Sequence, residues 1–312
     1  VRTLSDFLIK FGASVMKSVA TTPDDFARIV STHLADTHFV FDRVRFMTCG
    51  EVVSLNWVPD RNDIARMTAL PQKLAKERAM PFLVVLKEFH NLMNADEYED
   101  VFKIMETQMR ERDRSEQFQA VYVMTGAMVN AMKFIFEEKR FFYRQVNHVA
   151  FTPVDEKEII EHIVKGFLNG MGKSFDRNLA MGACELFKCN LWYMNHLAAI
   201  CDALSKGFVT ENMMTDALNS MISVHEPRFV SIVNDLTDHQ LSLMKAVLDG
   251  VVKFSASDVI EKYHLNSSAN VRRVKDALKK KEVITFNEKD EPVVLDPLFE
   301  YWIRRYYFEM TE

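Results

Sequence analysis

The hydrophobic pattern in the first half of the chain switches between two periods. Apolar residues that recur every three or four positions give each of several predicted helices one apolar stripe. The helices predicted in this way cover residues 3–20, 22–34, 63–78, 96–112 and 129–138. Between the second and third of them, residues 38–58 change period around Cys49-Gly50, which predicts two strands joined by a turn.

Short apolar runs predict the strands of a sheet. Residues 83–86 are apolar without interruption, and the charged pair Lys87-Glu88 follows them directly. Such a run predicts a strand that is buried on both faces, as in a parallel sheet. Residues 118–125 form a second run, and a further strand is expected near residues 148–151. Helices and strands thus alternate as in a doubly wound α/β sheet, where ligands bind beyond the carboxyl ends of the strands.

The second half of the chain is predicted to be helical almost to its end. Four helices are expected at residues 155–168, 176–188, 190–205 and 210–226. Three shorter helices and two short strands follow, at residues 238–249, 256–264, 268–281, 283–286 and 293–295. Three helices and a β-hairpin predict a winged helix. We therefore expect three domains, an α/β core at 1–153, a helical lid at 154–234 and a winged helix at 235–312.

Composition narrows the class of protein. Of the 312 residues, 48% are hydrophobic and 27% are charged, which predicts a globular protein with an ample core. The net charge of -5 argues against a protein that coats nucleic acid along its whole surface. Neither a long apolar run nor a signal-peptide pattern is present, so we expect a cytoplasmic protein without a membrane span. The cysteines lack metal-ligand spacing and are expected to be reduced, buried thiols: Cys49, Cys184, Cys189 and Cys201.

The sequence contains no Walker A motif, the phosphate-binding loop G-x-x-x-x-G-K-[ST]. Gly172-Lys173-Ser174 matches the end of that motif, but Phe167 occupies the position of its first glycine. This segment also follows a predicted helix, whereas a phosphate-binding loop follows a strand. We interpret it as a turn between two helices, with Ser174 as a helix cap.

Four segments give the chain a resemblance to a known family. The apolar run 83–86 with Glu88 and Phe89 resembles a Walker B strand, and Thr125-Gly126 ends the next strand as a sensor segment does. Residues 141–144 resemble a Pro-Phe-Tyr-Arg/Lys segment, and residues 189–193 resemble a Gly-Asn-Pro-Trp-Tyr turn. Together they resemble prokaryotic AAA+/STAND-like P-loop ATPases, which have a P-loop core, a helical lid and a winged helix. The resemblance places Val1 just after the family's second strand, so we expect a Walker A motif upstream of Val1.

The resemblance implies ATP as a cofactor, but one replacement weakens the case for Mg²⁺ and for hydrolysis. The residues that it marks are Glu88, Thr125 and Arg144 as catalytic and Lys87, Asn190 and Trp192 as nucleotide-binding. Lys87 stands where the family has the aspartate that supports magnesium. An ammonium there would repel a divalent ion by about 4 kcal/mol at close range and intermediate dielectric. Lys87 either replaces part of the metal's charge on phosphate or reaches solvent at the end of a decayed site.

Other departures and candidates are weaker. Ala127 replaces a serine, and Cys189 and Leu191 replace the glycine and proline of the lid turn. The pair Glu88-x-His90 offers too few ligands for a metal ion, so His90 is expected to be solvated.

The third helix of the predicted winged helix is strongly basic. Its charged residues are Arg272, Arg273, Lys275, Lys279, Lys280 and Lys281, against Asp276 alone. This pattern suggests contact with duplex DNA, and the alternative is a solvated face on a domain that packs against the ATPase core or a partner protein. The partners expected besides DNA are another protein or a second copy of this chain. The sequence favours an ATP-binding regulatory ATPase of the AAA+/STAND-like group. The alternative is a non-enzymatic, winged-helix DNA-binding or scaffold protein built on a decayed ATPase.

Overall fold

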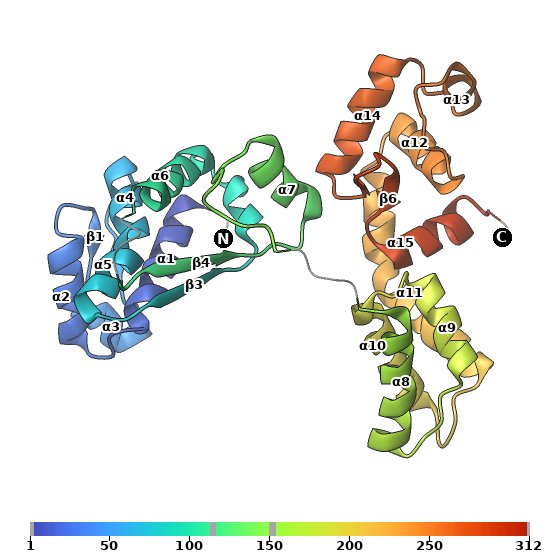
Figure 1. Cartoon of the computed structure of the whole chain (residues 1–312), viewed down its shortest axis with the longest axis horizontal. Coiled ribbons are helices and arrows are strands. Elements are labelled where there is room, and N and C mark those ends of the chain that lie inside the picture. Colours follow the sequence, from blue (N-terminus) through green and yellow to red (C-terminus); the bar gives the residue numbers. More distant parts are fainter. Residues whose placement is uncertain (1–2, 113–116, 150–153, 311–312) are drawn as a thin grey trace. The chain divides into compact units, whose positions relative to one another are not determined.

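The computed structural model describes residues 3–112, 117–149 and 154–310, which belong to two compact units, residues 1–149 and 150–312 (Figure 1). The first unit opens with the helices α1 (Leu4–Lys17) and α2 (Pro23–His33). Thr3 and Thr22 cap them by accepting hydrogen bonds from backbone N–H groups of the first turns. Each helix buries one apolar face, as predicted.

The region predicted as two strands around a turn also contains a helix. β1 (Phe39–Val40) pairs antiparallel with β2 (Ser54–Leu55), and α3 (Arg43–Cys49) lies between them in the chain. Asp42 caps α3 through two backbone N–H groups, and Gly50 ends it in a left-handed conformation with φ of 71°. Cys49-Gly50 is therefore a helix C-terminus and not a hairpin turn.

The helix predicted at 63–78 is divided in two. α4 (Arg61–Thr68) and α5 (Leu70–Arg78) meet at Ala69, and a proline occupies the first turn of α5, where its missing N–H costs nothing. At the start of α4, Asp60 and Asp63 form a capping box. The fully buried Asp63 carboxylate also accepts from His38, at 2.8 Å from the backbone N and 2.8 Å from Nδ1. This carboxylate ties the chain before β1 to α4.

The two predicted strands form a parallel pair. β3 (Phe82–Leu86) and β4 (Ala120–Met124) align Phe82 with Ala120 and Leu86 with Met124. α6 (Tyr98–Glu111) connects them, and α7 (Val129–Lys133) with one further helical turn (Phe134–Glu138) follows β4. Residues 148–149 form no strand, and the rest of the strand predicted at 148–151 lies outside the described residues.

Among the residues that the structure describes, only one face of this sheet is buried, so the prediction of a strand buried on both faces is wrong. Phe82, Val84 and Ala120 point into the core, and the helices gather on that side of the strands (Figure 1). The exposed fractions on the other face are 67% for Leu83, 49% for Val85, 53% for Val121 and 41% for Val123. The sequence does not reveal this difference because both faces carry aliphatic side chains.

The second unit begins with the predicted helices. They are α8 (Glu156–Met171), α9 (Arg177–Leu186), α10 (Leu191–Leu204) and α11 (Glu211–Asn234). α11 continues through Pro227, although the helix was predicted to end near residue 226. Phe229 and Val233 lie beyond the proline and are buried, and the Phe229 ring packs 5.5 Å from that of Phe299. This packing outweighs the helix-breaking tendency of proline.

Three helices and a hairpin complete the unit. They are α12 (Asp238–Leu248), α13 (Ser257–Lys262), α14 (Ser268–Lys280), β5 (Ile284–Phe286) and β6 (Pro292–Val294), followed by α15 (Pro297–Trp302). One continuous hydrophobic core runs from Ile159 to Ile303. A boundary between lid and winged helix near residue 235 therefore stays a prediction. None of the helices that the structure describes combines the length and apolarity that crossing a bilayer needs.

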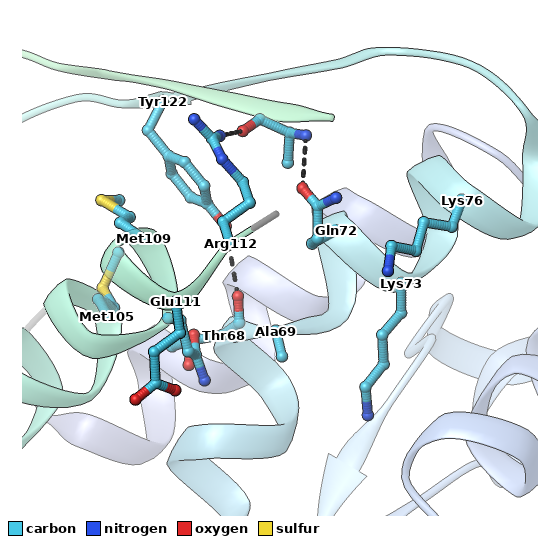
Figure 2. A pocket seen from close by; sticks show the side chains of 12 residues that line it. Thr68, Ala69, Gln72, Lys73, Lys76, Met105, Met109, Glu111, Arg112 and Tyr122 are labelled. Carbon is cyan, nitrogen blue, oxygen red and sulfur yellow. Dashed lines mark hydrogen bonds between the residues drawn. The ribbon is translucent and has the colours of Figure 1, made fainter. Parts of the chain in front are cut away.

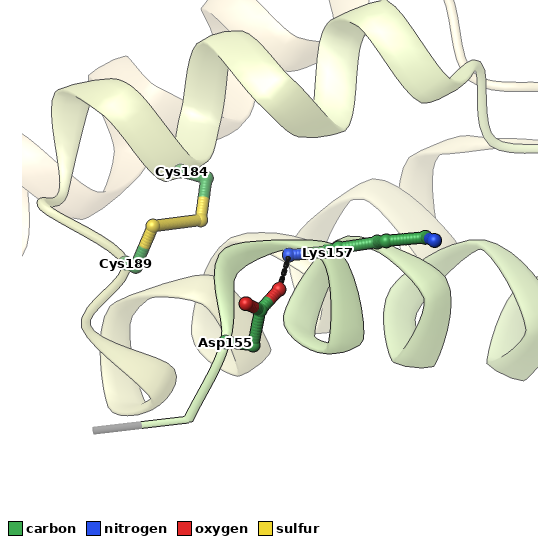
Figure 3. Close-up of a disulfide and its surroundings, with 4 residues drawn as sticks. All are labelled: Asp155, Lys157, Cys184 and Cys189. Carbon is green, nitrogen blue, oxygen red and sulfur yellow. Dashed lines mark hydrogen bonds between the residues drawn. A yellow bond between two sulfur atoms is a disulfide. The ribbon is translucent and has the colours of Figure 1, made fainter. Parts of the chain in front are cut away.

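Two cysteines of this unit are joined, contrary to the expectation of reduced thiols. After α9 the chain turns back through left-handed residues, and Cys189 N donates to Cys184 O at 2.7 Å. That turn brings the two Cα atoms to 4.3 Å and allows the disulfide Cys184–Cys189 (Figure 3). Cys201 is a buried thiol, as predicted, whereas Cys49 is an exposed thiol at the end of α3, so its predicted burial is wrong. Burial raises the pKa of Cys201 to about 11, which keeps it protonated.

The segment that resembles the end of a Walker A motif is a turn between helices, as predicted. Gly172 ends α8 with φ of 64°, and Lys173 Nζ donates to the Asp202 carboxylate at 2.6 Å. Ser174 is not a cap: its backbone bonds to residues 207–209, and Asp176 caps α9 instead. The lysine thus has a structural partner in the same unit.

Candidate functional site

The carboxyl ends of β3 and β4 lie side by side. Thr125 N donates to Leu86 O at 3.0 Å, and Phe89 N donates to Thr125 O at 2.9 Å. These two bonds extend the parallel ladder past the strands and bring Lys87 and Glu88 next to Thr125. This edge is the place where an open α/β sheet binds its ligands.

Glu88 links the two strand ends. The residue has a left-handed backbone with φ of 52°, which turns the chain sharply after β3. Its Oε2 accepts from Ala127 N at 3.3 Å, and 49% of the side chain is exposed. The carboxylate is therefore positioned at the sheet edge and still reaches solvent.

His90 is buried, so the prediction of a solvated histidine is wrong. Only 6% of the residue is exposed, and its Nε2 lies 3.5 Å from Glu88 Oε2. Within the described part of the chain, Nδ1 has no hydrogen-bond partner. A Cβ at position 126 would come within 2.7 Å of this Nδ1, so His90 fits here because residue 126 is glycine. Glu88 thus accepts a hydrogen bond from Ala127 N and lies close to the His90 ring at the strand ends.

Lys87 is exposed and has neither a hydrogen bond nor an ion pair to any described residue. Glu88 belongs to none of the three-ligand clusters found among the described residues. Magnesium prefers several oxygen ligands in octahedral geometry. One carboxylate beside an ammonium does not meet that requirement, so these residues do not fit a Mg²⁺ ion.

The other predicted catalytic residues contribute differently. Thr125 is exposed and uses its backbone groups to join the strand ends. In residues 141–144, Phe141 and Phe142 are buried in the core of the first unit. Arg144 is exposed with φ of 60°, and its guanidinium lies 5.2 Å from the Tyr143 ring centre. Among the described contacts, none joins Arg144 to Glu88.

The predicted nucleotide-binding residues of the second unit lie at the start of α10. Asn190 caps this helix, and its Oδ1 accepts from Trp192 N at 3.1 Å and from Tyr193 N at 3.2 Å. Trp192 is 57% exposed, and its ring packs edge-on against His196 and His225 at 5.2 Å and 5.8 Å. The Asn190 oxygen is thus engaged, whereas the Trp192 ring offers a surface for stacking.

The basic helix α14 uses part of its charge internally. Its apolar face is buried through Val271, Val274 and Leu278. Lys275 Nζ lies 4.0 Å from the Phe286 ring centre and 3.7 Å from Asp290 Oδ1. Lys281 Nζ donates to Asp235 O and, at 3.2 Å, to Gln240 Oε1.

The remaining basic side chains of α14 are Arg272, Arg273 and Lys280, which are exposed, and Lys279, which is half-buried. Arg273 donates to Asn270 within the helix at 2.9 Å. The basic face that solvent can reach is therefore smaller than the sequence suggests.

Comparison with known proteins addresses the fold. A family described as a probable winged helix domain matches residues 227–305. The Walker-type ATPase paby2304 of Pyrococcus abyssi superposes on 97% of this chain and 79% of its own, with 13% identity and a TM-score of 0.62. The chain has an AAA+-like fold. The predicted fold class, an AAA+-like α/β core with a C-terminal winged helix, is thereby confirmed.

More distant similarity exists to the ORC2 protein of Aeropyrum pernix, with 12% identity and a TM-score of 0.48 over 81% of this chain and 69% of that chain. No curated protein matches the chain in sequence. At these identities the comparisons show the fold and leave the roles of individual residues as predictions.

Within this AAA+-like fold, the structure brings Lys87, Glu88 and Thr125 together at one sheet edge. Asn190 and Trp192 belong to the other unit. Sequence reasoning missed the hydrogen bond from Ala127 N to Glu88 and the contact of Glu88 with His90. The available signal was Gly126, since a glycine directly after a strand often marks a close approach of another group.

Proposed function

We propose that this protein is an AAA+-like regulatory nucleotide-binding protein of the STAND-like type, in which hydrolysis is strongly impaired. The observation that carries the proposal is the pair at the end of β3. Lys87 is exposed without an acidic partner, and Glu88 is bonded to Ala127 N and adjacent to His90. The likeness to a Walker-type ATPase supports nucleotide as the ligand.

The positive charge of Lys87 explains why the protein would bind a nucleotide and yet hydrolyse it poorly. An ammonium beside the strand ends attracts phosphate and opposes a divalent ion. Phosphoryl transfer depends on metal ions that neutralise the charge developing on the phosphate oxygens. Lys87 can supply part of that charge to a bound phosphate, but it cannot arrange phosphates and water as a metal ion does. In this proposal Glu88 would serve as the base, but the residues around it do not supply the ligands of the metal ion that would make it effective.

The test is calorimetric titration of ATP with and without Mg²⁺ on the wild type, Lys87→Asp and the control Lys103→Met. Lys103 is an exposed lysine of α6. We expect weak, magnesium-independent binding by the wild type and its control, with negligible turnover. Lys87→Asp should make ATP binding depend on magnesium, and it should raise turnover only where a Walker A motif is also available. Tight, magnesium-dependent binding and ready turnover by the wild type would refute the proposal.

A second candidate function is binding of duplex DNA through α14. The observation that favours it is the exposure of Arg272, Arg273 and Lys280 on one helix of a winged helix. Phosphate contacts make affinity fall steeply with salt, with a log–log slope of about 0.9 per contact. Replacing all three residues by alanine should flatten that slope and abolish most binding. Lys275→Ala should lower stability, since Lys275 lies over Phe286, and leave the slope unchanged. A DNA affinity that does not change with salt concentration, or the absence of DNA binding, would favour a protein partner for this domain.

A further inference from the structure

A cavity of about 340 Å³ opens in the first unit between α5 and α6 (Figure 2). Its floor is Ala120 and Tyr122, on the buried face of the sheet in the first half of β4. The cavity therefore lies away from the strand ends that carry Glu88 and Thr125. Its volume falls within the range of small-molecule sites, about 300–1,000 Å³.

A side chain from α5 and one from the residue that follows α6 form hydrogen bonds with the backbone of Ala120 at the start of β4. These bonds border the cavity. Gln72 Oε1 accepts from Ala120 N at 2.9 Å, and Arg112 Nη1 donates to Ala120 O at 2.7 Å. Tyr122 Oη donates to Thr68 O at 3.3 Å across the same space. Because the side chains of Ala69 and Ala120 are small, they leave open the space between these hydrogen bonds.

The lining combines positive charge with an apolar wall. The lining contains three basic residues, Lys73, Lys76 and Arg112, and one acidic residue, Glu111. Lys73 Nζ has no hydrogen bond or ion pair to a described residue. Partial burial and repulsion from Arg66 lower the pKa of Lys73, against a weaker attraction by Asp36. Arg112 Nε is buried and also lacks a partner among the described residues.

The apolar wall comes from the opposite helix. Figure 2 shows Met105 and Met109 of α6 on the side away from Lys73 and Lys76 of α5. Methionine side chains adapt to irregular apolar groups. A half-buried ammonium and a buried guanidinium N–H that lack partners among the described residues favour a bound anion.

We infer that this cavity binds a small amphipathic anion, whose carboxylate or phosphate lies at the basic side of the cavity near Lys73 and whose apolar body lies on Met105 and Met109. The ligand class differs from the nucleotide proposed for the strand ends. The cavity does not require Lys87 or Glu88, so either proposal can fail alone.

The test uses three probes with the same apolar chain, namely octanoate, octyl phosphate and the neutral octanol. Titration calorimetry should show binding of at least one anion to the full chain and much weaker binding of octanol. The stronger anion identifies the head group. Excess ATP should not displace it, and displacement by ATP would show that the cavity is the nucleotide site and overturn the inference.

Variants separate this cavity from the exposed apolar face of the sheet. Lys73→Met keeps the apolar stem and should weaken anion binding about tenfold or more, as loss of a charge-assisted contact does, while leaving octanol unchanged. Ala69→Leu fills the space and should weaken all three probes. Lys103→Met, on α6 but outside the cavity, should change nothing.

A second experiment uses the wild-type protein alone, so it does not depend on the folding of any variant. Bound octyl phosphate or octanoate should protect Lys73, but not Lys103, from acetylation by an amine-reactive reagent measured by mass spectrometry. Equal binding of octanol and both anions, or anion binding that is unaffected by Lys73→Met and gives no protection, would overturn the inference.

Discussion

The small sheets of the two units differ in how their side chains are buried. The β3–β4 pair of the first unit has one buried face, and the other exposes Leu83 and Val121 by more than half. In the second unit, Ile284 and Val294 of the β5–β6 hairpin are buried in the core, and Lys275 lies over Phe286. Parallel sheets are ordinarily covered on both faces. Among the described residues, nothing covers the open face of β3–β4.

The difference teaches where each unit draws its stability. Each unit buries one continuous apolar core. The first unit also contains a polar tie that is itself fully buried, the carboxylate of Asp63. In the described part of the chain each unit has one capping box, Asp60 with Asp63 in the first and Thr237 with Gln240 in the second. Only the first box has a fully buried carboxylate, which also bonds to His38.

The largest effect should come from Asp63→Ala. The substitution leaves the N–H groups of Asp60 and His38 without their acceptor, and we expect a loss of about 3 kcal/mol in the free energy of unfolding. The matched change in the second unit, Thr237→Ala, should cost about 1 kcal/mol. Both losses can be measured by urea unfolding, with hydrogen exchange of peptides from each unit as the probe of unfolding. Equal losses in the two units would show that the comparison is wrong.

The second prediction tests the open face inside one strand. Val84→Ala removes buried atoms and should cost about 2 kcal/mol, whereas Val85→Ala on the exposed face should cost less than about 0.5 kcal/mol. The residues are adjacent and chemically identical, so each serves as the control for the other. Equal costs in urea unfolding would mean that the face of Val85 is covered in solution.

Much of this fold follows from local sequence signals. Helical periodicity with Thr and Asp caps predicts α1, α2 and the helices of the second unit, and the two apolar runs predict β3 and β4. The winged helix follows from helix lengths and the hairpin turn. These elements share the property that neighbouring residues decide them.

The features that were predicted wrongly have a different cause, because contacts between residues far apart in the sequence determine them. Val84 and Val85 look alike in sequence, and only the placement of the helices makes one buried and the other exposed. α11 passes Pro227 because Phe229 packs against Phe299. Cys184 and Cys189 meet because of a left-handed turn after α9.

The candidate site was predicted less completely than the fold. Lys87, Glu88 and Thr125 were placed correctly at the strand ends, since parallel strands end at the same sheet edge. The buried His90 depends on the space beside Gly126, which no local pattern reports.

The smallest effect should be the pH dependence of the His38–Asp63 pair. Burial opposes ionisation of Asp63, but hydrogen bonds from Asp60 N and from His38 outweigh it and hold the pKa of Asp63 below its usual range. The hydrogen bond to Asp63 raises the pKa of His38. The Asp63 contribution to stability is therefore lost only as pH falls through its lowered pKa. The His38 contribution is complete below the unfolded pKa of histidine and is lost as pH rises through the raised pKa.

Both groups are charged together between about pH 4 and 6.5, the ordinary pKa values of aspartate and histidine. We expect the wild type to be more stable than His38→Gln in that window, since glutamine keeps a neutral donor but lacks the charge. The difference should fade as pH rises above neutrality, and its size should be below that of Thr237→Ala. Urea midpoints measured across this pH range, with hydrogen exchange to isolate the first unit, check the prediction. A stability difference that persists unchanged at alkaline pH would show that His38 acts through packing or hydrogen bonding alone, and the first unit would then resemble the second in depending on neutral contacts.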